Sequence, residues 1–378
     1  MYGAQLIEAL RRRDPALEFF GVGGERMREA GCDTIVDASD LSVVGITEIL
    51  GHLPKIWGLF HKLIDEADRR KPDLAIVIDS PAFNWRVARQ MKKRDIPVIY
   101  YVAPQFWAWR QGRVRLLRKY ITKALVIFPF EQKFYRDRRV DATFVGHPLA
   151  ELPPPSITRE DYATQFNLDL AKQWITIMPG SRVKEVRMNL PTMLDATALL
   201  GAGFEFLLPV APTIDRELLT ESTKGRGITL VSTALPALHH SRAAIVASGT
   251  ATVEAAMMCT PFVMVYRVSQ LTYTLGKPRI KVPYFAMVNL IAGERVVPEL
   301  VQGDFTAERV VSRLREILPD SPTRTNMLEG LARVKARLRA PSEQASAADR
   351  AADAVLALTS HGVRSSLRKN AATAEERL

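Results

Sequence analysis

Cysteine is scarce in this chain of 378 residues, which contains only Cys32 and Cys259. Two cysteines so far apart provide neither a disulfide framework nor the closely spaced ligands of a zinc site, and a reducing cytosol fits this composition. Long apolar runs are missing too. None reaches the roughly 18 residues that span a bilayer, so we expect a soluble or peripheral protein.

Several nucleotide-binding motifs are also absent. The chain has no G-x-x-x-x-G-K-[ST] loop, and GVGGER at residues 21–26 lacks the G-x-G-x-x-G spacing. These absences argue against ATP hydrolysis and dinucleotide redox chemistry. Because no D-x-D pair occurs, there is no evident ligand set for a metal-chelated diphosphate.

Acidic residues are outnumbered by basic ones, 41 against 52, which gives a formal net charge of +11. We therefore expect an anionic partner, which could be nucleic acid, an anionic membrane surface or a phosphorylated substrate. The excess is largest at residues 101–140, where ten Lys or Arg accompany only Glu131 and Asp137. Such a segment suits an anionic membrane face.

Apolar runs typical of strands alternate with amphipathic stretches typical of helices, which is the pattern of parallel sheets covered on both faces. The expected strands are LEFFGV, DLAIVID, IPVIYYV, ALVIF and ATFVG in the first half, and WITIMPG, FEFLLPV, ITLVS, AAIVAS and PFVMVYR in the second. Prolines concentrate in GHPLAELPPPS, residues 146–156, which we interpret as a linker between two domains.

The chain is therefore expected to form two doubly wound α/β domains, at residues 1–150 and 151–335. Helices at 336–360 follow and either return to the first domain or swap into a partner, and the polar tail at 361–378 is expected to be disordered. Two such domains bind ligands at the carboxyl ends of their strands, in the crevice between them.

Residues 177–186, IMPGSRVKEV, run from a strand through a tight turn into a helical pattern. Free backbone N–H groups, the helix dipole and Arg182 favour a phosphate or a carboxylate at this turn. The alternative is that Gly180 only allows the turn and Ser181 only caps the helix.

A second turn of this kind occurs in ASGTATVEAA, residues 247–256. Gly249 and Thr250 can bring backbone N–H groups close to a phosphate. Glu254 lies about one helical turn further on, where it accepts hydrogen bonds from a ribose or is merely a capping or solvated residue. Two phosphate-type turns in one domain favour a nucleotide diphosphate.

Asp79 ends the expected strand DLAIVID and begins DSPAFN. A carboxylate at a strand end can act as a general base, or it caps the next helix. Aromatic residues in the basic segment, and the helix LPKIWGLFHKLI at residues 53–64, can contact acyl chains or fill the core. The aromatic residues of the basic segment next to Arg110 are Phe106, Trp107 and Trp109.

Eight segments become recognisable as a set: IDSPAFN, VAPQFWAWRQGRV, FPFEQKFY, FVGHPLAE, MPGSRVKEV, ASGTATVEAA, VYR and VNLIAGERVVPELVQ. From Tyr2 to about Leu358 the chain resembles lipid-A-disaccharide synthases, inverting bacterial glycosyltransferases of the GT-B architecture with two Rossmann-like domains. The resemblance implies transfer of 2,3-diacylglucosamine from UDP to 2,3-diacylglucosamine 1-phosphate (lipid X), without a metal ion or cofactor. The products would be UDP and a β-1',6-linked disaccharide 1-phosphate.

The resemblance also implies roles for individual residues. Asp79 would take the proton of the acceptor 6-hydroxyl, and Arg182 would stabilise the departing UDP. Ala82 stands where the family often has a second acidic residue, so we expect no helper carboxylate. The implied UDP-binding residues are Gly180, Ser181, Arg182, Gly249, Thr250, Glu254, Arg267, Asn289 and Gln302. The expected acceptor or membrane contacts are Phe106, Trp107, Trp109 and Arg110.

One departure from the family pattern lies at the front, because its first strand and glycine-rich loop have no counterpart before Tyr2. The preferred explanation is a misplaced start codon or a trimmed chain, with a functional short form as the alternative. In the short form we expect the neighbouring strands to be unpaired, stability to be low and acceptor handling to be impaired. His147 in GHP is interpreted as a hinge residue, with polar support of the site as the alternative.

The expected partners are UDP-2,3-diacylglucosamine, lipid X and the anionic cytoplasmic face of the inner membrane, and a homodimer is left open. Another GT-B enzyme acting on a UDP-sugar, such as a UDP-N-acetylglucosamine 2-epimerase or a peptidoglycan-lipid transferase, is the main alternative. An RNA-binding module is a more distant one, since no RNP, KH or zinc pattern accompanies the basic aromatic segment, and we expect no nucleic-acid partner.

Overall fold

The computed structural model describes residues 1–41, 46–276, 278, 280–339 and 345–359. Internal contacts divide the chain into an N-terminal unit, Met1–Pro148 with the C-terminal helix at residues 347–359, and a second unit, Leu149–Arg339. The division falls inside the proline-rich segment at 146–156. The tail at 361–378, expected to be disordered, lies outside the described residues.

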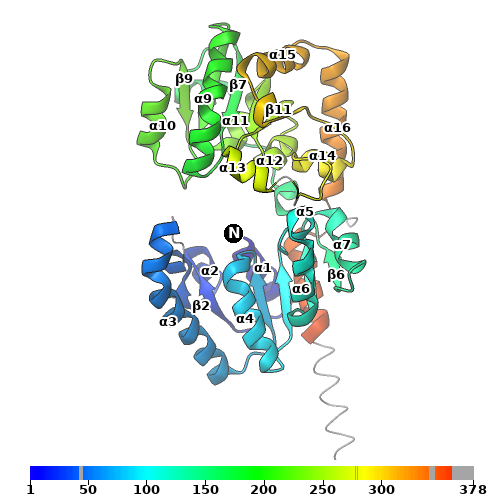
Figure 1. Cartoon of the computed structure of the whole chain (residues 1–378). Helices are drawn as coiled ribbons and strands as arrows, with labels where there is room; N and C mark the ends of the chain where they lie inside the picture. The colour runs from blue at the N-terminus through cyan, green and yellow to red at the C-terminus, as the bar shows by residue number, and fades with distance from the viewer. Residues whose placement is uncertain (42–45, 277, 279, 340–344, 360–378) are drawn as a thin grey trace, which may run out of the picture. The chain divides into compact units, whose positions relative to one another are not determined.

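Parallel strands form the centre of the N-terminal unit (Figure 1). Four pair in the order β3-β4-β5-β6, while β1 and β2 form a separate two-stranded sheet. In the described part of this unit β1 and β3 are thus not paired with each other. The strands are β1 (Phe19–Gly23), β2 (Cys32–Asp37), β3 (Ala75–Ile78), β4 (Val98–Tyr101), β5 (Lys123–Val126) and β6 (Ala142–Phe144).

Helices follow most of these strands, as the alternating pattern predicts. They are α1 (Tyr2–Arg13), α2 (Glu25–Glu29), α3 (Ile46–Arg70), α4 (Pro81–Lys93), α5 (Phe106–Trp109), α6 (Val114–Tyr120) and α7 (Pro129–Arg136). The strand β4 reads VIYY and is buried at every position, because it is paired on both sides and covered on both faces.

The second unit contains one six-stranded parallel sheet with the order β12-β11-β10-β7-β8-β9. Its strands are β7 (Gln173–Met178), β8 (Phe204–Pro209), β9 (Ile228–Val231), β10 (Ala243–Ala247), β11 (Phe262–Tyr266) and β12 (Glu299–Val301). The chain runs outward from β7 to β9, then returns to β10 and continues to the other edge. This is a doubly wound sheet whose strand order reverses between β7 and β10.

Helices separate the strands of this unit, and several begin at a capping side chain. Thr158, Asp215, Thr306 and Ser321 each accept a hydrogen bond from a backbone N–H in the first turn of the helix that follows. The helices are α8 (Arg159–Phe166), α9 (Val183–Leu200), α10 (Arg216–Thr223), α11 (Ala234–His240), α12 (Ala251–Met257), α13 (Gln270–Gly276), α14 (Met287–Ala292), α15 (Ala307–Ile317) and α16 (Pro322–Leu338).

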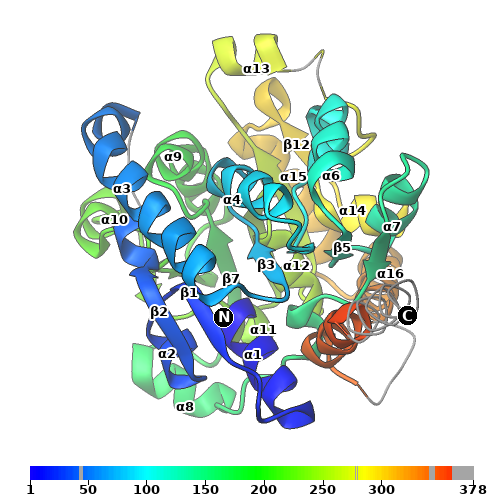
Figure 2. The same ribbon diagram turned by 90° about the horizontal axis from the view of Figure 1, so that it is seen from below.

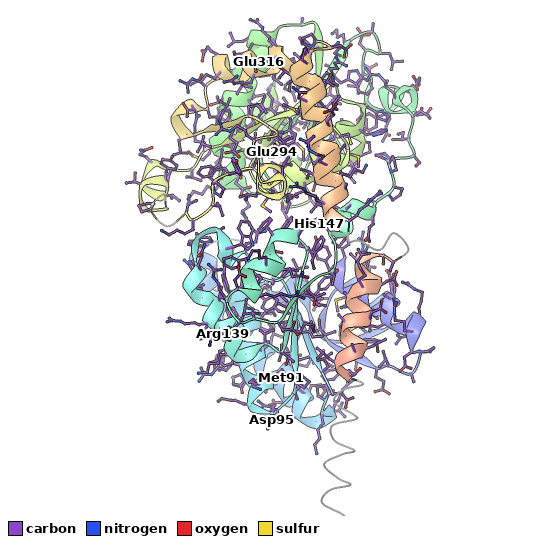
Figure 3. All side chains as sticks on the ribbon, turned by 90° about the vertical axis from the view of Figure 1, so that its right-hand side faces the viewer. Met91, Asp95, Arg139, His147, Glu294 and Glu316 are labelled. Carbon is purple, nitrogen blue, oxygen red and sulfur yellow. The ribbon has the colours of Figure 1, made fainter. Side chains whose placement is uncertain are left out.

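The helix at residues 347–359 belongs to the N-terminal unit, where it lies near α1 (Figures 2 and 3). Asp349 accepts hydrogen bonds from Arg12 and Arg13, both at 2.8 Å, and Asp353 accepts one from Arg13 at 2.6 Å. These ion pairs join the first and last described helices of the chain. None of the helices in the described ranges is both long and apolar enough to cross a bilayer.

Candidate active site

Two turns of the second unit lie where its strand order reverses. The chain leaves β7 through Gly180 and Ser181 into α9, and it leaves β10 through Gly249 and Thr250 into α12. Met178 of β7 is paired with Val246 of β10, so both turns start at the same edge of the sheet and on neighbouring strands. In sheets of this topology the crevice at this point is where ligands bind. The structure therefore brings together four residues that the sequence predicts for the nucleotide site.

The first turn already holds a carboxylate. The Ser181 N–H donates to Oε2 of Glu185 at 3.1 Å, and Arg182 Nη1 donates to its Oε1 at 2.8 Å. Gly180 has φ +122°, and a Cβ there would lie 2.6 Å from Glu185 Oε2, so only glycine allows this approach. The Arg182 side chain is 80% exposed and can meet a ligand. Geometry and charge at this turn thus suit an anion.

The second turn differs because no described residue lies within 4 Å of the position that a Cβ of Gly249 would take. Gly249 has φ +138° and open space where a Cβ would be. Glu254, in the next helix, is half-buried, and burial raises the pKa of its carboxyl group. Its carboxylate has no hydrogen-bond or ion-pair partner among the described residues. A half-buried carboxylate without a protein partner suits a hydroxyl donor from a ligand, as the ribose hypothesis requires.

Asn289 is also predicted to bind UDP, but the structure uses its side chain within the fold. It is fully buried, donates to the Val297 carbonyl at 3.0 Å and to Glu299 at 2.9 Å, and accepts from the Val296 and Val297 N–H groups. The structure therefore corrects the expectation of a direct contact with UDP. Asn289 instead holds the loop between α14 and β12.

Arg267 and Gln302 likewise make contacts within the second unit. The Arg267 guanidinium donates to Thr192 Oγ1 at 2.6 Å and to the Phe305 carbonyl, which joins α9 to the segment before α15. The Gln302 amide accepts from the Val268 N–H at 2.8 Å and donates to the Val268 carbonyl at 3.0 Å. Both residues brace the chain that follows β11, and a direct contact with UDP stays a prediction for them.

Asp79 follows β3 in the N-terminal unit. It is exposed, and its side chain makes no hydrogen bond to another described residue, so the structure does not use it to cap α4. Its backbone carbonyl accepts from Tyr100 Oη and from Asn84 Nδ2, both at 2.6 Å. Asp79 thus presents a free carboxylate from a firmly held backbone. Ala82 lies exposed in the first turn of α4.

Of the four predicted acceptor or membrane contacts, two are core residues. Phe106 is 5% exposed and Trp107 is 4% exposed, and Trp107 Nε1 donates to the buried Glu131 at 2.8 Å. The expectation that these two side chains meet the acceptor or a membrane is therefore corrected, because they are packed inside the unit. Trp109 remains 48% exposed, and the Arg110 guanidinium lies 3.8 Å from its ring centroid.

The apolar side chains of helix α3 likewise include both buried and exposed residues. Phe60, Leu63 and Ile64 are buried, whereas Trp57 is 57% exposed and stacks on Phe60. His147 is buried at the end of the N-terminal unit, with its ring 5.3 Å from that of Phe128 (Figure 3). The hinge and support interpretations of His147 both stay predictions.

Sequence reasoning missed three residues that shape these sites: Glu185, Tyr100 and Asn84. Glu185 sits three residues into α9, where an acidic side chain commonly reaches back to the preceding turn. That spacing was a usable signal. The sequence contains no such signal for Tyr100, because its hydroxyl reaches Asp79 only through the pairing of β3 with β4.

Solved structures that match this fold include glycosyltransferases and UDP-sugar epimerases. The calicheamicin glycosyltransferase CalG4 matches with a TM-score of 0.58 at 16% identity, covering 94% of this chain and 93% of that one. The UDP-GlcNAc 2-epimerase from Neisseria meningitidis bound to UDP-GlcNAc matches with a TM-score of 0.56 at 12% identity, covering 93% and 94%. The predicted GT-B fold class is thereby confirmed.

Sequence comparison narrows this class. A family described as lipid-A-disaccharide synthetase matches residues 1–354. The lipid-A-disaccharide synthase of Koribacter versatilis is 52% identical over 364 residues, covering 95% of each chain, and that of Myxococcus xanthus is 43% identical over 368 residues, covering 96% of this chain and 95% of the relative. The chain belongs to the lipid-A-disaccharide synthase family and is a glycosyltransferase, as its resemblance implies.

Proposed function

We propose that this protein transfers 2,3-diacylglucosamine from UDP to the 6-hydroxyl of 2,3-diacylglucosamine 1-phosphate with inversion. The observation that carries the proposal is the turn after β7, which holds a carboxylate through a backbone N–H and the Arg182 guanidinium at the switch point of a doubly wound sheet. Family membership supplies the sugar and lipid classes.

In this reaction the Asp79 carboxylate takes the proton of the acceptor hydroxyl. The resulting oxygen attacks the anomeric carbon of the donor, and the bond from that carbon to the UDP oxygen breaks. UDP leaves with an additional negative charge, which Arg182 and the N–H groups of the two turns stabilise. No metal ion or cofactor takes part.

Both turns bind the diphosphate, and the helix after the second turn also binds the ribose. The diphosphate binds at Gly180, Ser181 and Arg182, with further backbone N–H groups from Gly249 and Thr250. Glu254 accepts hydrogen bonds from the ribose, because its half-buried carboxylate has no partner among the described residues. Arg267 and Gln302 keep the chain after β11 in place beside this site.

The test is mass spectrometry of the product formed from UDP-2,3-diacylglucosamine and 2,3-diacylglucosamine 1-phosphate, with NMR of the new anomeric centre. A β-linked disaccharide 1-phosphate and stoichiometric UDP are expected. The D79A variant should lose transfer and keep UDP binding. Incubation with UDP-N-acetylglucosamine alone tests the epimerase alternative, and conversion to the 2-epimer would overturn the proposal.

We further propose that the protein acts in the cytoplasm, peripherally bound to the anionic inner-membrane surface. Trp109 and Trp57 are exposed aromatic residues, and α6 together with the residues before it presents Arg110, Arg113 and Arg115 to solvent. Exposed tryptophan and basic side chains are the groups that bind an anionic lipid interface. Sedimentation with phosphatidylglycerol vesicles is expected, and equal recovery with phosphatidylcholine vesicles would contradict the electrostatic part.

A further inference from the structure

The backbone at Asp79 adopts an unusual conformation. Asp79 has φ +48°, and the next residue, Ser80, has φ +39° and ψ +61°. Both residues carry a Cβ, for which the left-handed region is sterically unfavourable. They are two adjacent left-handed residues, whereas the other non-glycine residues with positive φ in the described chain occur singly. Strain of this kind persists only when the surroundings hold it in place.

Two buried side chains hold this turn through a single carbonyl oxygen. The Asp79 carbonyl accepts from Tyr100 Oη at 2.6 Å and from Asn84 Nδ2 at 2.6 Å. Asn84 also donates to the Ile78 carbonyl at 3.0 Å. Tyr100 is fully buried and Asn84 is 8% exposed, so both donor side chains are held inside the unit, and the hydrogen bonds that they make are partly buried. The Asp79 N–H is fixed as well, because it donates to the Tyr101 carbonyl at 3.1 Å.

Tyr100 is itself held in one orientation. It lies in β4, one residue before the partner of Ile78, and its ring packs against the Trp85 ring at 6.0 Å. Trp85 in turn stacks on Phe106 at 5.8 Å. Burial raises the pKa of Tyr100 far above its ordinary value, so the hydroxyl remains a donor. A phenylalanine would fill the same apolar space without reaching the carbonyl.

The three hydrogen bonds act on the backbone of Asp79 and leave its carboxylate free. With its N–H and carbonyl both fixed, the direction of its Cα–Cβ bond is fixed too. A base held in this way needs little reorientation before it meets a substrate hydroxyl, and misplacement of a reacting group by about 1 Å can cost a factor of roughly 100 in rate.

We propose that Tyr100 and Asn84 are positioning residues for the transfer reaction, which clamp the left-handed turn and aim the Asp79 carboxylate at the acceptor. The inference rests on the proposed role of Asp79 as the base. It assigns to the motif residue Asn84 and to the strand residue Tyr100 an effect on turnover rather than on substrate binding.

The main test variant is Y100F, which removes one hydroxyl from the clamp. Its matched control is Y135F, because Tyr135 is also a fully buried tyrosine of this unit whose hydroxyl donates to a backbone carbonyl, that of Pro104. Y100F should lower kcat roughly tenfold with the acceptor KM within about twofold. The melting temperature of Y135F should fall by about as much as that of Y100F, but its kcat should stay within about twofold of the wild type.

A double-mutant comparison separates positioning from general damage. In the D79A background Y100F should cause no further loss of the residual rate, since there is no carboxylate left to aim. Equal kcat values for Y100F and Y135F, or an equal loss caused by Y100F with and without Asp79, would overturn the proposal. Wild-type turnover by D79A would instead refute the assignment of the base itself.

The variant N84S tests the second hydrogen bond independently, and it keeps the inference testable if Y100F does not fold. Serine is small and polar but too short to reach the carbonyl of residue 79. A reduced kcat with unchanged UDP affinity is expected. A folded N84S protein with wild-type kcat would count against the clamp.

Discussion

At the scale of single residues, the decisive feature is the pairing of Arg182 with Glu185. A guanidinium at the start of a helix meets a carboxylate from the first turn of the same helix, and the Ser181 N–H completes the contact. Glu185 thus occupies hydrogen-bond donors that a phosphate would use. The same three groups therefore keep the turn in shape, and its two donors suit an anion.

The first prediction concerns Arg182. The R182A variant should lose roughly two to three orders of magnitude in kcat, because a fixed positive charge at a developing anion is commonly worth that much. Steady-state transfer assays measure the effect. R187A removes an exposed arginine from the same helix and should retain wild-type activity. Equal losses in the two variants would indicate a general charge effect instead.

The second prediction concerns Glu185. In E185Q the neutral side chain competes less well for Arg182 and the Ser181 N–H, so UDP should bind several-fold more tightly. Isothermal calorimetry with UDP measures this. Helix stability should fall by about 0.5 to 1 kcal/mol, because an acidic group near the helix start is lost. Unchanged UDP binding would mean that Glu185 leaves the turn at no energetic cost, and weaker binding would mean that Glu185 supports the bound state.

At the scale of secondary structure, the sequence predicted the elements that carry the turns more reliably than the contacts of their side chains. The strands β7 and β10 were predicted because they are apolar and end in glycine turns. The strand β2, CDTIVD, was missed because its two acids break the apolar pattern. The sequence analysis assigned Asn289 and Trp107 to ligand contacts, but both side chains are buried. The direction of a side chain depends on tertiary packing, which no local sequence pattern specifies.

Two buried titratable groups flank Phe128, between β5 and α7. Glu131 accepts from the Phe128 N–H at 3.1 Å, and burial raises its pKa to about 7. Burial lowers the pKa of His147 to about 4. Between their ordinary and folded pKa values the folded state binds more protons at Glu131 and fewer at His147. Rising pH therefore removes stability through Glu131 as the pH passes its folded pKa of about 7, and adds stability through His147 up to about pH 6.5.

The third prediction follows from these opposite signs. The two effects oppose each other below about pH 6.5, and only the Glu131 effect remains from there to about pH 7.5, so wild-type stability should fall across this upper window. Denaturant unfolding at several pH values tests this. E131Q has no carboxyl group to ionise and should not show the fall. If both proteins have the same slope between pH 6.5 and 7.5, Glu131 does not titrate there.

At the scale of the whole molecule, the two ends of the described chain meet in one unit, while the two turns proposed to bind UDP lie in the other. The helix at 347–359 buries Ala347, Ala351, Ala352 and Val355 on one face. Its ion pairs with Arg12 and Arg13 then secure it beside α1. The N-terminal unit is thus completed by residues that follow the entire second unit in sequence.

The last prediction uses this separation. V355D places a charge on the buried face of the helix and should destabilise the N-terminal unit by roughly 3 kcal/mol or more, since an unpaired charge would be buried. The UDP affinity should stay within about twofold, because every proposed UDP ligand lies in Leu149–Arg339. Differential scanning calorimetry and UDP titration measure the two quantities on the same sample.

D353A is the matched control: its carboxylate is 60% exposed, so loss of that ion pair should cost only about 1 kcal/mol or less. A parallel loss of UDP binding in V355D would show instead that the two units do not fold independently.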